Sequence, residues 1–409
     1  MCRGRSRHIN DFGAGVSSPA NRPLEGLRVV ELGALVAAPF CGMLLGDLGA
    51  EVIKIEPPEG DMARAFAPFV EGESAFFMSV NRGKRSVAID VKDPEALSWV
   101  RKIAASADVV IHNYRSGVAE RLGLGYADLQ SDNPGLIYCA VSGFGPSGPM
   151  AKRPGIDLIF QAESGMLAIT GTPDGPPVKV GTNAADVYAA TTAAACINAA
   201  LVRRGITGLG CQVDVSLRDA FLSLQACWFG SYLATGIQPA RVGAGSPFTA
   251  PTDVYPTADG YIVLAVVNDK HWRIFCETLG LTDLADDSRF VDNESRVTHV
   301  EFLRKIVSDS LAARTTADWL SAFKSAQIPA GEVMEYADVV ADEQVQLNQM
   351  VIEFQHAGGF AVRTQGVPFW FDGVKADLVV PPPALGQHTI EILREMGCTE
   401  EAARRLAER

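Results

Sequence analysis

The sequence predicts an α/β protein whose mostly parallel sheet carries helices on both faces. From Pro23 onward, short β-branched runs alternate with helical stretches, and this alternation is typical of βαβ units. The 409 residues exceed what one ordinary core needs, so about two domains, or one large domain with an insertion, are expected. A stretch rich in Gly and Pro over residues 235–260 marks a loop or a domain boundary.

The expected elements follow one another along the chain. After a loose tail over residues 1–22, the sequence predicts helices at 37–50 and 94–107 and strands at 27–33, 51–58, 85–91, 108–114 and 136–145. The small residues of 189–202 indicate a closely packed helix, and a strand, "CQVDVSL", and one apolar helix, "DAFLSLQACWFGSYLA", follow it. The segment from "YIVLAVV" to about residue 333 is helix-rich and predicts a smaller domain. One last amphipathic helix is expected after "VVPPPALGQH".

The composition excludes several classes of protein. Hydrophobic residues make up 47% of the chain and charged residues 21%, which is typical of a soluble globular protein. The formal charge of −12 leaves no excess of basic residues for nucleic acid. No uninterrupted apolar run reaches the ~18 residues of a membrane-spanning helix. Neither nucleic acid nor a membrane is therefore an expected partner.

The spacing of cysteine and histidine argues against a metal centre. The eight cysteines are scattered, with no CxxC pair, and the six histidines form neither an HExxH nor an HxH motif. Scattered thiols of this kind are typical of reduced, mostly buried side chains in a cytosolic protein. We therefore expect a cytoplasmic location and no metal site.

The junction after the first strand, "ELGALVAAPFCG", is where a dinucleotide-binding protein would carry its glycine loop. It lacks the GxGxxG fingerprint, and Glu56 at the end of the next strand stands directly before prolines. A nicotinamide-dependent dehydrogenase is therefore disfavoured.

Polar side chains follow the strand "DVVIHNY". Asn113, Tyr114 and Arg115 end it, and Arg121 follows on the next segment. These side chains suit a nucleotide, because a ring stacks on a base and a guanidinium binds phosphate in a fork. Ordinary loop residues, with Tyr114 as a half-buried plug, are the alternative. Lys92, after the strand before it, is a further candidate for phosphate.

Two loops and one turn complete the candidates. The segments 142–157 and 241–247 are rich in Gly; each is either a plain connector or hinge, or a site-lining loop or lid. Pro173-Asp174-Gly175 is a tight-turn sequence. Its carboxylate either serves the turn alone or performs chemistry.

A set of motifs in a fixed order then resembles one family. The motifs are "PLEGLRVVELG", "AAPFCGMLLGDLGAEVIKIEPPEGD", "NRGKRSVAIDVK", "VVIHNYRSGVAERLGLGY", "GFGPSGP", "RPGIDLIFQAESGMLAITGTPDGPPVKVG", "YPTADGYIVLAVVNDKHW" and "PPPALGQHT". They resemble the family III CoA-transferases, the CaiB/BaiF-like group that includes formyl-CoA and carnitine CoA-transferases. The resemblance runs from about residue 23 to about residue 398.

The resemblance implies a domain organisation. A Rossmann-like large domain would be formed by residues 23–225 together with 341–409, and a small central α+β domain by residues 226–340. It also implies an interlocked homodimer.

The resemblance further implies the chemistry. The family's nucleophile matches Asp174 of "DGPP"; it would attack an acyl-CoA thioester and pass through a mixed anhydride and an aspartyl-CoA thioester. Acyl-CoA and a carboxylic acid would be the substrates, with succinyl-CoA and a small dicarboxylate favoured, and no tightly bound cofactor. The loop from Gly243 to Gly245 would close over the intermediate.

The family's CoA contacts carry over by position. They match Val36, Ala37, Ile89, Lys92, Asn113, Tyr114, Arg115 and Arg121. The sequence departs from its relatives at Ser142, a lysine in some of them, and at Pro57, an arginine in formyl-CoA transferase. In the acceptor region, Ala244 and Ser246 replace the asparagine and histidine of related dicarboxylate enzymes.

Two alternatives to a transferase stay open. One is a CoA-binding protein without turnover, which the intact "PDGPP" motif disfavours. The other is an α-methylacyl-CoA racemase of the same superfamily, whose catalytic histidine would stand at Ile156. Isoleucine cannot move a proton, so Asp186, which matches the racemase's second aspartate, lacks its partner.

Overall fold

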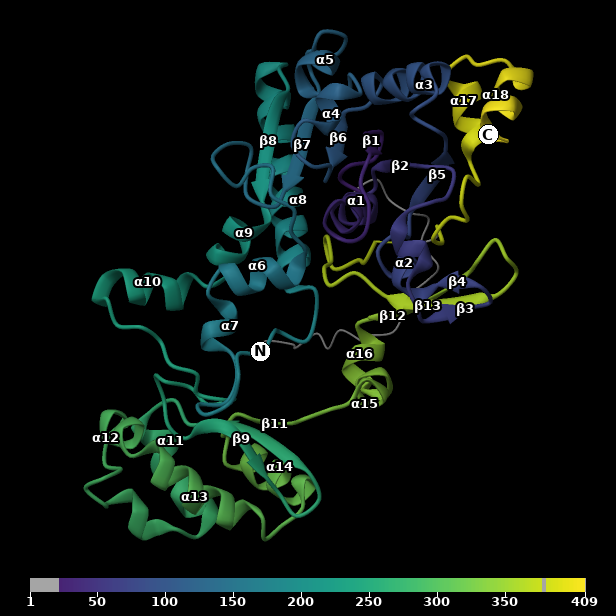
Figure 1. Ribbon diagram of the computed structural model, residues 1–409. Helices are drawn as coiled ribbons and strands as arrows, with labels where there is room; N and C mark the ends of the chain where they lie inside the picture. Colours follow the sequence, from purple (N-terminus) through teal and green to yellow (C-terminus); the bar gives the residue numbers. More distant parts are fainter. Residues whose placement is uncertain (1–21, 377–379, 409) are drawn as a thin grey trace, which may run out of the picture. The chain divides into compact units, whose positions relative to one another are not determined.

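The computed structural model describes residues 22–376 and 380–408, so nearly all of the expected tail lies outside the described residues (Figure 1). The chain divides into two compact units. The first comprises residues up to 160, 182–224 and 346 onward, and the second comprises 161–181 and 225–345. Residues 161–181, which the sequence analysis assigned to the large domain, therefore cluster with the second unit.

The first unit contains the larger share of the secondary structure. Its elements are β1 (Arg28–Glu31), α1 (Ala37–Asp47), β2 (Glu51–Glu56), the 3₁₀ helix η2 (Met62–Ala65), β3 (Phe69–Val70), β4 (Glu73–Ser74), α2 (Ala75–Ser79), β5 (Lys84–Ala88), α3 (Pro94–Ala105), β6 (Val109–His112), α4 (Val118–Arg121), α5 (Tyr126–Gln130), β7 (Ile137–Ser142), α8 (Ala184–Thr207), β8 (Cys211–Ser216), α9 (Leu217–Leu224), β12 (Val351–Gln355), β13 (Ala361–Gln365), α17 (Thr389–Glu395) and α18 (Glu400–Ala407).

The second unit is built mainly of helices. Its elements are α7 (Met166–Ile169), α10 (Ala226–Thr235), β9 (Thr252–Pro256), β10 (Tyr261–Ala265), α11 (Asp269–Leu279), the 3₁₀ helix η3 (Thr282–Ala285), α12 (Asn293–Thr298), α13 (Val300–Leu311), α14 (Thr316–Ser325), β11 (Ala330–Glu332) and α15 (Tyr336–Ala341). Helices α6 (Asp157–Glu163) and α16 (Glu343–Leu347) cross the division between the units.

A six-stranded parallel sheet forms the centre of the first unit. Its strand order is β5-β2-β1-β6-β7-β8, and every neighbouring pair is parallel. In the register of the sheet, Val29 of β1 lies opposite Val52 of β2 on one side and Val109 of β6 on the other. The strand order reverses between β1 and β6, and an open α/β sheet binds its ligands at such a switch point. The expected mostly parallel sheet is confirmed.

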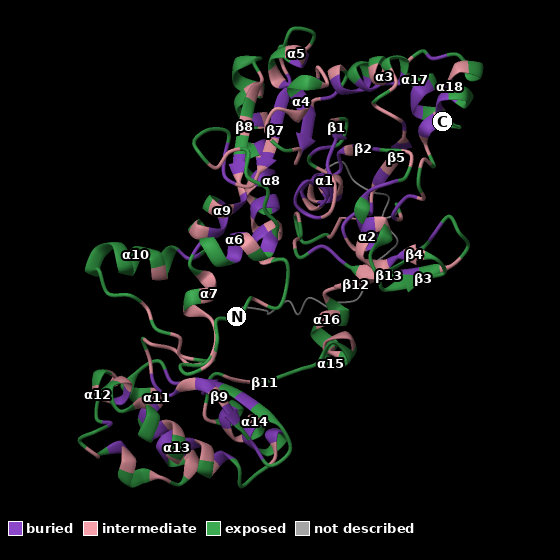
Figure 2. Ribbon diagram, in the orientation of Figure 1, coloured by how far each residue is buried: buried purple, intermediate pink, exposed green. Residues whose placement is uncertain are grey.

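Both faces of this sheet are covered by helices, because successive side chains of a strand point to opposite faces. Val30 belongs to a core that also contains residues of α3, α5, α17 and α18. The other face is covered by α1 and α8, which pack on each other and on the strands. Figure 2 shows the inner strands β1, β2, β6 and β7 as mostly buried. The carboxyl-terminal residues Ile392, Leu393 and Leu406 thus complete a core that the amino-terminal half begins.

Helix α8 is the one helix of the described residues long and apolar enough to cross a membrane, judged by length and composition alone. It packs against α1, α9, β7 and β8. Small side chains such as Ala189, Ala190 and Ala193 are fully buried in these contacts, which explains the small-residue pattern of the sequence.

Three expected elements differ in the structure. The single apolar helix of residues 219–234 is two helices, α9 and α10, which part at Gln225, where the side-chain amide donates to the main-chain oxygen of Ser164, 3.0 Å away. The Gly- and Pro-rich stretch contains β9, which pairs antiparallel with β10. The final amphipathic helix is also two helices, because Gly397 adopts a φ of 90° between α17 and α18.

The second unit has its own core. Strands β9, β10 and β11 form a three-stranded sheet, and Trp272, Phe275, Trp319 and Phe323 are buried beside it. The Trp319 and Phe323 rings stack with centroids 5.6 Å apart, and Trp319 Nε1 donates to the oxygen of Leu311. A buried aromatic core of this size makes the unit a firm support for the loops that it carries.

Candidate active site

Asp174 lies at the tip of a tight turn in the second unit. The N–H of Gly175 donates to the oxygen of Thr172 over 3.1 Å, which is the bond that defines a β-turn. The Asp174 side chain is exposed, and within residues 22–376 and 380–408 its carboxylate has no hydrogen-bond or ion-pair partner. The expected turn is present, and it leaves the carboxylate unpaired.

The turn is tied to the loop that begins at Arg241. Arg241 donates from Nη2 to the oxygen of Gly175 (2.9 Å) and from Nε to the oxygen of Thr172 (3.3 Å). The N–H of Gly243 donates to the oxygen of Gly171 over 2.9 Å. The structure therefore joins two segments that the sequence analysis treated separately. Arg241 is a candidate that sequence reasoning missed, since nothing near it in the chain signals a partner.

The glycine loop makes specific demands on its backbone. Gly243 has a φ of 70°, a value that favours glycine. A Cβ on Gly245 would crowd the ion pair between Arg304 and Asp253. The N–H of Gly245 donates to the oxygen of Val242, and that of Gly243 is also occupied. Ala244 lies between these two glycines, and its N–H has no hydrogen-bond acceptor among the described residues.

In the first unit, the loop between β1 and α1 lies at the switch point of the sheet. The side chains of Val36 and Ala37 are buried, so only their main-chain groups can contact a ligand. Asn113, at the end of β6, bonds both main-chain groups of Ala34: Oδ1 accepts from its N–H (3.0 Å), and Nδ2 donates to its oxygen (2.8 Å). The structure thus brings Asn113 to the Val36–Ala37 loop.

The cationic candidates are exposed. Arg115 and Arg121 are exposed and have no ion-pair partner among the residues that the structure describes. The Arg121 side chain reaches the turn that follows Arg115, because a Cβ placed on Gly117 in that turn would lie 3.3 Å from Arg121 Nη1. Lys92 is exposed after β5, and its N–H donates to Asp90 Oδ1. Unpaired guanidinium groups beside a switch point suit phosphate groups.

Ile89 and Tyr114 stand apart from these cations because they are partly or fully buried. Ile89 is buried, and its N–H donates to the oxygen of Glu56 over 2.9 Å. Tyr114 packs against His112, with ring centroids 5.6 Å apart. His112 Nδ1 accepts from the N–H of Tyr114, and burial lowers the pKa of this histidine to about 4. His112, which sequence reasoning also missed, is therefore a neutral support for the loop after β6.

Asp186 lies in the first turn of α8. Burial, and then the nearby charge of Asp157, raise the pKa of Asp186 to about 7. Asp157 Oδ1 accepts from the main-chain N–H groups of Ala185 (2.8 Å) and Asp186 (3.3 Å), so it caps the helix. Ile156, beside it, is 64% exposed and carries no titratable group.

The residues that depart from the family pattern serve local turns. Ser142 Oγ accepts from the N–H of Gly145 over 3.2 Å. Ser246 Oγ accepts from the N–H groups of Phe248 and Thr249. Neither side chain adds a charge to its surroundings.

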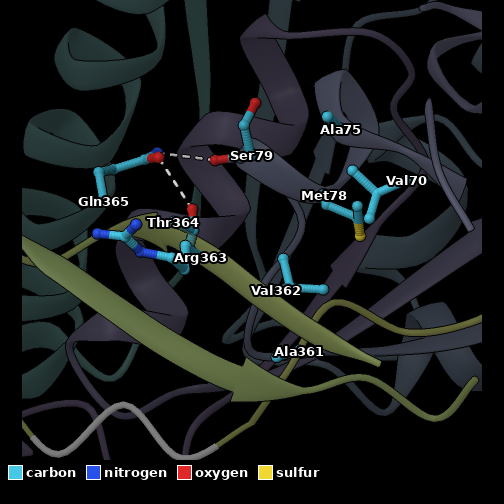
Figure 3. A pocket seen from close by; sticks show the side chains of 9 residues that line it. All are labelled: Val70, Ala75, Met78, Ser79, Ala361, Val362, Arg363, Thr364 and Gln365. Carbon is cyan, nitrogen blue, oxygen red and sulfur yellow. Dashed lines mark hydrogen bonds between the residues drawn. The ribbon is translucent and has the colours of Figure 1, made fainter. Parts of the chain in front are cut away.

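A cavity of about 160 Å³ lies elsewhere in the first unit, between β13 and α2. Figure 3 shows that Gln365 donates to the main-chain oxygen of Ser79 (2.7 Å) and accepts from Thr364 (2.9 Å). None of the residues expected from the sequence lines this cavity, and these two polar side chains are already paired.

Comparison with known proteins identifies the class of enzyme. CoA-transferase family III matches residues 24–389. The succinate–glutarate CoA-transferase of Agrobacterium fabrum is 38% identical over 93% of this chain and 97% of its own. The succinyl-CoA:glutarate CoA-transferase of Mus musculus is 38% identical over 93% of this chain and 88% of its own. The crystal structure of a CAIB/BAIF family protein from Brucella suis superposes with a TM-score of 0.84 at 37% identity, over 92% of this chain and 100% of that one.

Proposed function

Because this chain belongs to CoA-transferase family III, we propose that it moves CoA from succinyl-CoA to a small dicarboxylic acid with Asp174 as the nucleophile. Two relatives are named for succinate or succinyl-CoA and glutarate, so glutarate is the first acceptor to test. The observation that carries the proposal is the Thr172–Gly175 turn, which holds an exposed, unpaired carboxylate in a fixed position.

The reaction proceeds through four exchanges at carbonyl carbon. The Asp174 carboxylate attacks the thioester, the C–S bond breaks, and a mixed anhydride and CoA thiolate result. The thiolate then attacks the aspartyl carbonyl, which releases succinate and leaves an aspartyl-CoA thioester. The acceptor carboxylate attacks this thioester to give a second anhydride, and the returning thiolate takes the acceptor's acyl group. Asp174 is regenerated, and no net bond energy is lost to water.

The anchoring of the turn is what makes Asp174 suitable for this role. An ion pair would lower the nucleophilicity of a carboxylate, and the described chain supplies none. Arg241 donates instead to the main-chain oxygens of Thr172 and Gly175. Its positive charge therefore stabilises the turn without forming an ion pair with the Asp174 carboxylate. The free N–H of Ala244, on the loop bonded to this turn, is a candidate donor to the oxyanion that forms at each attack.

Acyl-CoA is a substrate in this proposal and not a resident cofactor. Its phosphates would be bound by Arg115 and Arg121, whose guanidinium groups are exposed and unpaired in the described residues. Lys92, Ile89 and Tyr114 remain proposed contacts for the rest of the nucleotide.

The proposal includes an interlocked homodimer in the cytoplasm. Association of two subunits is supported by apolar side chains left exposed on and after α10, at Phe229, Tyr232, Leu233 and Ile237. Several large apolar side chains left exposed on one short segment are typical of a protein interface. Sedimentation of the purified protein tests the dimer.

The experiment for the function is a panel of acids assayed against succinyl-CoA and acetyl-CoA, followed by trapping with hydroxylamine. Transfer of CoA to glutarate, and conversion of Asp174 to its hydroxamate only when acyl-CoA is present, would support the proposal. Binding of CoA with no transfer to any acid and no adduct would favour a CoA-binding protein without turnover. Epimerisation of a 2-methylacyl-CoA would favour the racemase.

A further inference from the structure

A buried network of two lysines and two carboxylates lies beneath the loop between β1 and α1. Lys54 Nζ is 2.8 Å from both Glu31 Oε1 and Asp61 Oδ2, and Lys84 Nζ is 2.7 Å from Glu31 Oε2. The side chains of Glu31, Lys54 and Lys84 are fully buried, and that of Asp61 is 1% exposed. Two positive and two negative charges balance within the cluster.

The pKa shifts of Lys54 and Asp61 favour their charged forms. Burial alone would lower the pKa of Lys54, but Glu31 and Asp61 together raise it above its ordinary value. Burial alone would raise the pKa of Asp61, but Lys54 lowers it. For Lys84, burial outweighs the attraction of Glu31 and lowers the pKa to about 8.

Each member of the network except Glu31 also bonds the main chain near the loop. Lys54 Nζ donates to the oxygen of Gly33 over 2.8 Å. Asp61 Oδ1 accepts from the N–H of Leu35 over 3.0 Å. Lys84 Nζ donates to the oxygen of Pro39 over 2.7 Å.

These bonds hold the loop in a conformation that it would not adopt unaided. Leu35 has a φ of 67°, in the left-handed region that is unfavourable for a residue with a side chain. The oxygens of Gly33 and Ala34 point to Lys54 and Asn113. In the described chain, the N–H groups of Ala37 and Ala38 have no acceptor, as is usual in the first turn of a helix.

Stability alone does not account for such a network. Removing four charges from water is costly, and apolar residues of similar volume often give an equally stable core. Glu31 ends β1, one of the two strands between which the strand order reverses, and the loop that follows it lies at the ligand-binding edge of this type of sheet. A buried network that fixes the main-chain geometry of this loop is better explained by the ligand that the loop must bind.

We propose that Lys54 and Asp61 are positioning residues for acyl-CoA, because they hold Gly33 and Leu35 and thereby shape the Val36–Ala37 segment that contacts the substrate. The inference rests on the proposed function, together with the CoA contact that the family resemblance implies for this segment. Neither residue touches the reacting atoms, so their loss should weaken binding far more than it slows turnover.

The test compares Asp61→Asn with a matched control, Asp47→Asn. Asp47 forms a buried pair with Arg82 (2.6 Å) in the same unit, and it does not bond the loop. We expect Asp61→Asn to raise both the Kd for CoA and the KM for acyl-CoA about tenfold or more, with kcat changed less than about threefold. Asp47→Asn should lower the melting temperature by a similar amount and leave the Kd and KM unchanged. Equal effects of the two variants on Kd would overturn the proposal.

A second variant separates positioning from stability. In Lys54→Met/Asp61→Leu, the pair of Glu31 and Lys84 remains balanced, so the fold should be retained. A folded double variant that binds CoA as tightly as the native protein would contradict the inference, whereas a raised Kd at an unchanged melting temperature would support it. The readout is CoA binding by calorimetry. If the proposed transferase function is wrong, the native protein will bind CoA but will not transfer it, and this result is distinct from an unchanged Kd in the variant.

Discussion

Arg241 Nη2 donates to the main-chain oxygen of Gly175, the residue that directly follows Asp174, over 2.9 Å. The two bonded residues are 66 positions apart in the chain. The position of the proposed nucleophile therefore depends on a side chain from a distant loop of the same unit.

Replacing Arg241 with Ala should slow the reaction without unfolding the protein. The turn would lose its bonds to Thr172 and Gly175, and a small displacement of a nucleophile costs roughly 10- to 100-fold in rate. We expect kcat to fall by that factor while the melting temperature changes little, since Arg241 is only partly buried. Arg273→Ala, which breaks an exposed pair with Asp286 in the same unit, is the control. Equal kcat values for the two variants would show that the anchor is irrelevant.

Replacing Asp174 with Asn should abolish transfer. An amide cannot form the anhydride, so we expect a loss of at least about 10³-fold in kcat/KM. The folded state should be unaffected, because the side chain is exposed and has no partner among the described residues. Circular dichroism checks that the variant is folded, and the transferase assay measures the loss of activity. Full activity in the folded variant would rule out this nucleophile.

Gly175→Ala should also impair transfer, and a second substitution should restore it. A Cβ at this position would collide with Thr172 Oγ1, which distorts the turn that carries Asp174. We expect roughly a tenfold loss of kcat. Thr172→Ala removes the colliding atom, so the double variant should recover most of the rate. If the double variant is as slow as Gly175→Ala alone, the collision is not the cause.

His112 should make the protein sensitive to acid. Its pKa in the folded state is lowered to about 4 by burial, whereas an unfolded histidine titrates near ~6.5. Between these two pKa values the unfolded chain binds more protons than the folded protein does. The free energy of unfolding is therefore highest above about pH 6.5 and decreases as the pH falls toward 4. Urea unfolding at several pH values measures this slope. His112→Gln should flatten it, and His299→Gln, at an exposed site, should leave it unchanged.

Asp186 should change the stability of the protein with pH in the opposite direction from His112. Its pKa is raised to about 7 by burial and by Asp157, above the ~3.9 of an unfolded aspartate. The folded state holds the proton more tightly, so stability declines as the pH rises from about 4 to 7 and is constant above that. Asp186→Asn should therefore stabilise the protein more at pH 8 than at pH 4. The same substitution at exposed Asp214 serves as the comparison, and an equal gain at both pH values for Asp186→Asn would disprove the shift.

The expected elements that the structure confirms are those with a strong local signal. Alternating β-branched runs predicted β1, β2, β5, β6 and β7, because strand and helix periodicity is a property of neighbouring residues. The break between α9 and α10 was missed, since Gln225 lies within one continuous apolar pattern and its bond to Ser164 is a tertiary contact. Strand β9 was missed for a related reason: Pro256 and Asp253 look like loop residues, yet Asp253 is buried beside Arg304.

By itself, the sequence determined the parallel α/β sheet, the family and the turn at Pro173-Asp174-Gly175. Each of these follows from patterns of adjacent residues or from motifs in a fixed order. Only the tertiary structure decided that Arg241 anchors the turn and that Lys54 and Asp61 hold the loop at Leu35. Hydrogen bonds and ion pairs act over about 3 Å, and which distant residues come within that distance depends on the packing of the whole unit.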